Sequence, residues 1–88
     1  MCRSIQPLHN YDPPSGQEDV RAAALQYVRK ISGMPRPARV NEAAFDRAVA
    51  AVATATSELL ASLVATTPPR DRAAERLLAR ARWERRQA

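Results

Sequence analysis

The feature that most constrains the fold is an alanine-rich stretch over residues 48–66, in which Glu58 is the only charged residue. A heptad-like series of mainly apolar positions begins just before this stretch and runs through it. Its members are spaced alternately four and three residues apart: Phe45, Val49, Val52, Thr56, Leu59 and Leu63. Because this spacing places the series along one side of an α-helix, it predicts a helix over about residues 41–65, capped by Asn41. At 1.5 Å per residue, such a helix is about 37 Å long.

A shorter helix and an extended arm precede this stretch. The spacing of Ser15 and Glu18 is that of a capping box, apolar residues recur at helical intervals after it, and Gly33 supplies a stop, so we expect a helix over about residues 16–31. Residues 1–14 contain prolines that restrict the backbone and predict an extended arm. The natural anchors of this arm against the helices are Ile5, Leu8 and Tyr11.

The predicted architecture is all-α. Thr67 followed by two prolines is typical of a helix start and predicts a basic C-terminal helix over about residues 69–85, after an antiparallel pair of the two earlier helices. We predict a single helical domain over residues 1–88, with residues 1–14 as the arm, 15–67 as the hairpin core and 68–88 as the C-terminal part. No charge interrupts residues 48–57, which predicts burial on more than one side.

The mismatch in helix length predicts self-association. The first helix, at about 24 Å, cannot cover the second. The chain contains one cysteine, which excludes an internal disulfide. We therefore expect the third helix or a second copy to cover the remainder, and predict a homo-oligomer formed through residues 41–66. These residues hold too few large apolar side chains for a membrane span, and the N-terminus does not resemble a secretory signal, so we expect a cytoplasmic protein with no membrane partner.

The charge distribution points to an acidic partner. The formal net charge is +5, and residues 68–88 alone carry seven arginines and three acids. On a helical wheel, Arg72, Arg76, Arg80 and Arg86 fall within an arc of about 120°, with Trp83 near its middle. Arginines bind phosphates and an aromatic ring stacks on a base, so this arc is a candidate nucleic-acid surface. The alternative is a solvated helix whose Trp83 is covered by arginine stems or by a partner subunit.

A second basic group surrounds the connector between the first two helices. It consists of Arg29, Lys30, Arg36 and Arg39, and it would extend the candidate nucleic-acid surface if the fold brought it beside the tail. The alternative is ordinary surface charge, in which Arg29 and Lys30 complement the carboxyl end of the first helix.

Cys2 is a candidate reactive thiol. Removal of Met1 would leave a terminal cysteine next to Arg3, which favours the thiolate. A cysteine nucleophile needs a base and an orienting partner, and a zinc site usually needs four ligands; the chain offers one histidine, His9. A buried thiol that docks the arm is the alternative. We predict no catalytic residue, no metal and no cofactor.

Four segments resemble a bacterial family of small uncharacterised proteins, domain of unknown function 2277. They are MCRSI at 1–5, AALQYVRKISG at 23–33, NEAAFDRAV at 41–49 and TTPPRDR at 66–72. The resemblance implies a compact helical protein and transfers no catalytic or binding residue. It gives more weight to Cys2, Arg3, Arg29 and Lys30, which lie inside the matching segments.

The sequence therefore leads to one principal hypothesis and two alternatives. The principal hypothesis is a non-enzymatic helical binding or assembly module that presents arginines to nucleic acid or another acidic partner. The alternatives are a structural or accessory protein-interaction subunit and a thiol or metal protein that uses Cys2.

Overall fold

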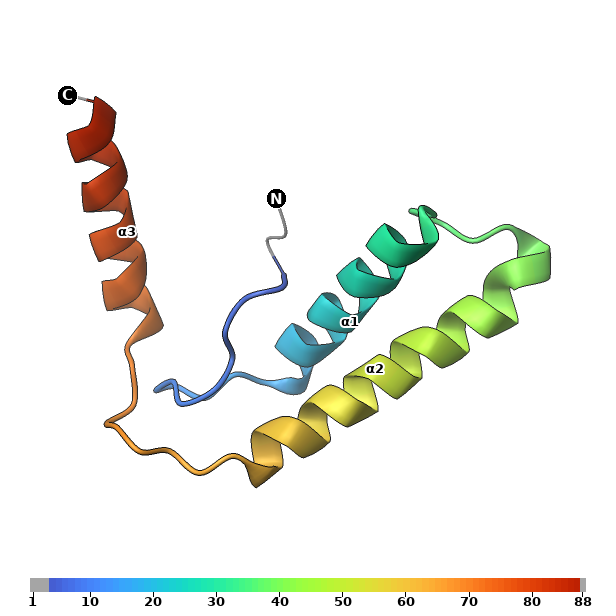
Figure 1. Ribbon diagram of the computed structural model, residues 1–88, viewed down its shortest axis with the longest axis horizontal. Helices are drawn as coiled ribbons and strands as arrows, with labels where there is room; N and C mark the ends of the chain where they lie inside the picture. The colour runs from blue at the N-terminus through green and yellow to red at the C-terminus, as the bar shows by residue number, and fades with distance from the viewer. Residues whose placement is uncertain (1–3, 88) are drawn as a thin grey trace.

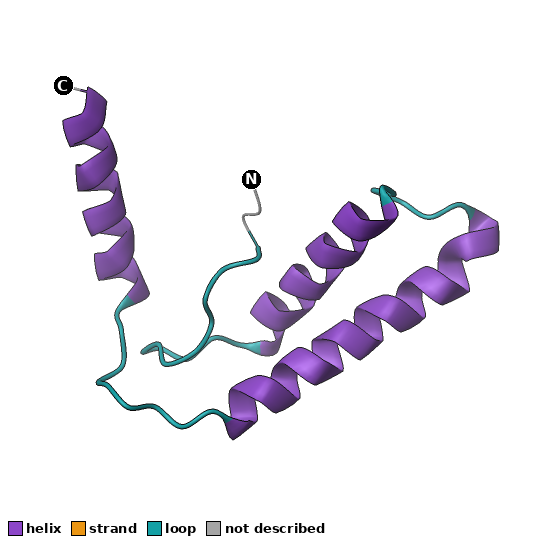
Figure 2. Cartoon of the chain, viewed as in Figure 1, coloured by secondary structure: helices purple, strands orange, loops and turns teal. Residues whose placement is uncertain are grey.

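The structure is a computed structural model that describes residues 4–87, and its regular elements are helical (Figure 1, Figure 2). In chain order they are α1 (Gln17–Ser32), a single 3-10 turn η1 (Arg39–Asn41), α2 (Glu42–Ser62) and α3 (Arg72–Gln87). The prediction of an all-α fold with an extended arm, an antiparallel helix pair and a C-terminal helix is confirmed. The three principal extents are 48, 36 and 15 Å, so the molecule is about one helix layer thick.

The core lies between α1 and α2. Ala24 and Val28 of α1 are buried against Phe45 and Val49 of α2, and five partly buried side chains pack around them. Ala24 is only 1% exposed, which shows how closely the two helices approach at this small residue. The first half of the apolar series on α2 is thus covered by α1, as its helical spacing predicts.

The start of α1 differs in detail from the predicted capping box. The N-cap residue is Gly16, whose backbone N–H donates a hydrogen bond of 3.0 Å to Asp19 Oδ2. Ser15 lies one residue outside the helix, so its pairing with Glu18 does not form. The helix ends as predicted at Gly33, which has a φ of 70° in the left-handed region that glycine adopts without strain.

The end of α2 and the start of α3 also differ from the predicted boundaries. The helix predicted over residues 41–65 ends at Ser62, because Leu63 is extended, with a ψ of 139°. The helix predicted from residue 69 begins at Arg72. Arg70 forms a backbone bridge to the arm and is therefore unavailable to a helix, and Asp71 caps the new start by accepting a 3.0 Å hydrogen bond from the Ala74 N–H.

α3 packs against neither α1 nor α2 within the described part of the chain. Of the two alternatives expected to cover the rest of α2, the third helix is therefore wrong, and a second copy stays a prediction. The arm lies between the two parts instead (Figure 1). Near its start it is attached to α1, where the Ser4 N–H donates to Gln26 Oε1 at 2.8 Å. Its apolar residues Ile5 and Leu8 line a hollow with the end of α2, as predicted for anchors of the arm.

Candidate functional site

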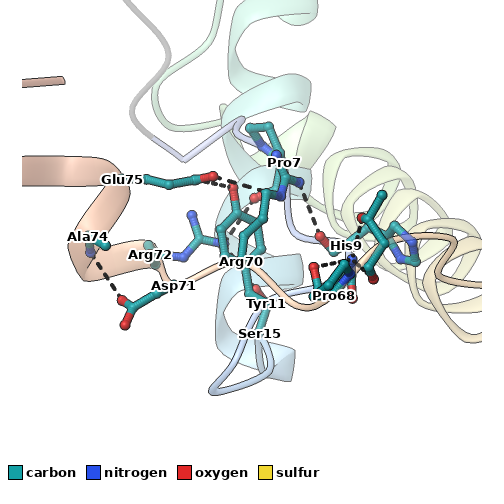
Figure 3. Close-up of polar contacts among 12 residues, drawn as sticks. Pro7, His9, Tyr11, Ser15, Pro68, Arg70, Asp71, Arg72, Ala74 and Glu75 are labelled. Carbon is teal, nitrogen blue, oxygen red and sulfur yellow. Dashed lines mark hydrogen bonds and ion pairs between the residues drawn. The ribbon is translucent and has the colours of Figure 1, made fainter. Parts of the chain in front are cut away.

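The most densely bonded part of the molecule is the junction between the arm and the start of α3 (Figure 3). Tyr11 is buried there. Its hydroxyl donates a hydrogen bond of 2.7 Å to Glu75 Oε1. Two guanidinium groups lie over its ring, with Cζ at 3.9 Å from the centroid for Arg72 and 4.6 Å for Arg70, which are cation–π distances. Tyr11 therefore anchors the arm, as predicted, but against α3 and not against the helix pair.

Backbone hydrogen bonds hold the segment before α3 against the arm. The Asp12 N–H donates to the Arg70 carbonyl at 2.9 Å, and the Arg70 N–H donates to the Asn10 carbonyl at 2.8 Å. The Asn10 side chain also donates to the carbonyl oxygens of Thr67 and Pro68, at 3.1 and 3.3 Å. Asn10 has a φ of 63°, in the left-handed region that asparagine tolerates better than most residues. These bonds set where α3 begins and which way it leaves the arm.

Arg72 has a structural role. Its Nη2 donates to the Pro7 carbonyl at 2.9 Å and to Ser15 Oγ at 3.2 Å, and its plane lies on Tyr11. These contacts use the two Nη2 hydrogens and fix the guanidinium group against the arm. The sequence placed Arg72 in the candidate nucleic-acid surface. In the structure it joins the arm to α3 and also lines the cavity beside them, and its binding role stays a prediction.

Glu75 places one negative charge among the arginines of the junction. It accepts the Tyr11 hydrogen bond with one oxygen, and its other oxygen lies 3.8 Å from Arg70 Nε. The hydrogen bond to Glu75, and then desolvation, raise the pKa of the Tyr11 hydroxyl above the ordinary value of 10.0. The Arg70–Glu75 ion pair is close to half exposed on both sides, so water screens it and it adds little stability.

An open cavity of about 480 Å³ lies beside this junction, between the arm and one side of α3. It is lined by Gln6, Pro7, Tyr11, Arg70, Arg72, Glu75, Arg76, Leu78, Ala79 and Arg82. Four arginines and one glutamate give it a strongly positive lining. Arg76 and Arg82 form no ion pair with any residue from 4 to 87, so their guanidinium groups remain available to an anion.

The chain matches the family described as uncharacterized conserved protein (DUF2277) over residues 1–78. The chain belongs to this family. The family match covers the arm, the helix pair and the first two turns of α3, and it includes Tyr11, Glu75 and Arg76 but not Arg82. It confirms the resemblance given by the sequence and extends it beyond residue 72. No curated protein and no solved structure matches the chain.

The predicted arginine arc is only partly preserved on α3. Arg80 Nε lies 3.1 Å from Glu84 Oε1, so an acid does pair with the arc at this position. Trp83 and Arg86 are exposed, and both lie beyond the family match. Sequence reasoning missed Arg82, because a helical wheel groups the residues on one side of a helix without showing which side faces a neighbour.

The basic group around the connector does not join the α3 arginines. Arg29 and Lys30 line a separate hollow on α1, and Arg36 and Arg39 are exposed between α1 and α2. Figure 1 shows that this connector and α3 occupy opposite ends of the molecule. The two basic groups therefore cannot form one continuous surface within a single copy.

Two further predictions concern the arm. Cys2 lies outside the described residues. His9 contributes its backbone carbonyl, which accepts a 3.2 Å hydrogen bond from Arg70 Nη2.

From residue 4 to residue 87, no three His, Cys, Asp or Glu side chains gather as a metal site would require. None of the helices in this range is both long and apolar enough to span a bilayer.

Proposed function

We propose that this protein is a non-enzymatic binding module that holds the phosphates of a single-stranded nucleic acid against α3 and the cavity beside it. The observation that carries the proposal is the pair Arg76 and Arg82, which line a cavity and form no ion pair among the described residues. Guanidinium groups bind phosphate oxygens in a bidentate manner, which makes such a pair suitable for a nucleic-acid backbone.

The position of α3 supports an extended ligand. Because α3 packs against neither of the other helices, most of its surface beyond the contact with the arm is accessible. Beyond the cavity it exposes Arg80, Arg85 and Arg86, and the exposed Trp83 offers a ring on which an unpaired base can stack. The combination of arginines with one aromatic ring favours a single strand over a duplex, whose bases are already stacked.

Binding to labelled single-stranded and double-stranded RNA and DNA, followed by fluorescence anisotropy, tests this proposal. If five arginines contact phosphates, the logarithm of affinity falls with the logarithm of salt with a slope of about −3.5 for a single strand, so raising salt from about 50 to about 200 mM weakens binding roughly a hundredfold. Absence of binding at the lower salt concentration contradicts the proposal.

Matched variants locate the site. Replacing Arg76 and Arg82 together with glutamine should weaken binding to every sequence and reduce the magnitude of the salt slope by about 1.4. Replacing Arg36 and Arg39 in the same way removes the same charge from the opposite end of the molecule and should leave the slope unchanged. Equal effects of the two double substitutions would show that only total charge matters.

A second candidate function is an accessory subunit that docks another protein. It is favoured by the far side of α2, where Ala50, Ala51, Thr54 and Ala55 are exposed and uncharged. We retain self-association through residues 41–66 as part of this proposal. Light scattering combined with a pull-down tests it, because a stable monomer that captures no protein contradicts it.

A further inference from the structure

The chain is only about one helix layer thick, which leaves its apolar surfaces without a second layer. Its shortest extent is 15 Å, whereas stable domains are built from at least two packed layers of secondary structure. Among residues 4–87 six side chains are buried, and the largest are Tyr11 and Phe45. A chain of this size with so small a core needs further burial, and with no internal disulfide, association is the available source.

One face of the helix pair carries a continuous apolar groove. It consists of two adjoining hollows of about 320 and 400 Å³, which share Tyr27 and Val52. Ile31, which is 71% exposed, lies in the first hollow, and Leu59 and Leu63 lie in the second. The lining is overwhelmingly apolar, and the arm borders only the second hollow. The groove therefore has the composition of a helix-binding surface.

α3 carries an apolar edge against which no other helix packs among residues 4–87. Leu77 and Leu78 are 70% and 59% exposed, and Ala81 lies one turn beyond Leu77. This edge cannot reach the groove of its own helix pair in the observed arrangement, because the bonds of Asn10 and Tyr11 fix the segment that leads into α3. In each copy, no helix lies in the apolar groove of the helix pair, and the apolar edge of α3 lies in no groove.

We propose that the leucine edge of α3 docks into the apolar groove on the helix pair of a second copy. The net charges of the two partners are opposite, because the helix pair contains five acids and four basic residues, whereas α3 contains six arginines and two glutamates. Reciprocal exchange of α3 closes a two-fold dimer and gives each copy the missing second layer. On the helical wheel Leu77 and Ala81 lie about 140° and 180° from Arg72, so Arg72 and Arg76 stay outside this contact. Leu78 also lines the cavity and lies about 40° from Arg82, so Arg82 stands at the border of the contact.

Disulfide trapping tests the contact directly. Because Cys2 is the only cysteine, a Cys2→Ser background is free of thiols. In that background, Leu77→Cys chains are mixed with Ile31→Cys chains that carry a different mass tag, and the mixture is oxidised. The expected product is the mixed Leu77→Cys/Ile31→Cys dimer. Ala79→Cys, on the cavity side of α3, is the matched control and should yield several-fold less mixed dimer.

Light scattering supplies the second readout. The wild-type chain should be a dimer, and Leu77→Glu should convert it to a monomer with unchanged helical circular dichroism, since Leu77 is already exposed within one copy. A wild-type monomer at every soluble concentration overturns the proposal. So does a dimer that survives Leu77→Glu, or a cross-link that joins two Leu77→Cys chains more efficiently than it joins the mixed pair.

Discussion

Phe45→Ala tests whether the contact between α1 and α2 is the source of the protein's stability. Phe45 is 8% exposed and packs with Ala24, Val28 and Val49. Truncating a buried phenylalanine to alanine typically costs about 3–5 kcal/mol. Phe45 also borders the open hollow of about 320 Å³, so water can reach part of the space it vacates. We therefore expect a loss near the lower bound, about 3 kcal/mol.

Such a loss is large for this chain. In a domain of 60–100 residues, 1 kcal/mol shifts the melting temperature by about 4–8 °C, so Phe45→Ala should lower it by about 12–24 °C. Thermal unfolding followed by circular dichroism, together with urea denaturation, measures the effect. Val64→Ala is the matched control, since Val64 is 83% exposed in the segment after α2 and should change the melting temperature by little. A loss below about 1 kcal/mol for Phe45→Ala would refute the assignment of the core.

Three further predictions concern local features. Tyr11→Phe removes the hydrogen bond to Glu75 and should accelerate hydrogen exchange in α3 without lowering the melting temperature of the helix pair; the half-exposed Tyr27→Phe is the control. In that Tyr27→Phe background, tyrosinate absorbance should titrate with a midpoint above 10.0, because the Glu75 hydrogen bond raises the pKa of Tyr11. The Tyr11 pKa is higher in the folded state than in the unfolded state, so the Tyr11–Glu75 hydrogen bond stabilises α3 docking fully below pH 10. This stabilisation is lost as the pH rises through the raised pKa, and a titration midpoint of Tyr11 at or below 10.0 contradicts it. Gly33→Ala should lower the free energy of unfolding by about 1 kcal/mol, measured by urea denaturation. The cost comes from the φ of 70° alone, since an added Cβ meets no atom within 4 Å; unchanged stability would contradict this.

The sequence contained enough local information to predict the helices. Helical spacing from Val20 to Val28 and from Phe45 to Val52 reflects the packing of α1 against α2, and the same spacing continues into the open groove at Ile31 and Leu63. The ends at Gly33 and near Asn41 follow from capping preferences. The start of α3 was not predictable in this way. It depends on a backbone bridge between Tyr11 and Arg70, which are distant in the sequence, and no periodicity encodes such a pairing. The same bridge explains why two prolines that favour a helix start stand outside the helix.

The candidate site was predictable in kind but not in arrangement. The distribution of charge along the sequence placed seven arginines in residues 68–88, where the cavity between the arm and α3 lies, and a second basic group around residues 29–39. The roles of individual arginines depend on which side of α3 the arm contacts, and this depends on the geometry at Tyr11. Arg72 therefore joins the arm to α3 at the edge of the cavity, whereas Arg82 lines the cavity from outside the predicted arc.

The attachment of α3 links the proposed ligand to the conformation of the whole chain. Because α3 packs against neither helix of the pair, its orientation depends on the arm alone. A ligand in the cavity would touch Gln6 and Pro7 of the arm as well as Arg76 and Arg82 of α3, and would therefore join the two segments. A ligand bound between the arm and α3 stabilises their docked arrangement by as much as its affinity for the docked chain exceeds its affinity for the undocked chain. Hydrogen exchange in α3 should accordingly slow when an oligonucleotide binds, whereas a ligand that holds only the outer arginines would leave the junction unchanged.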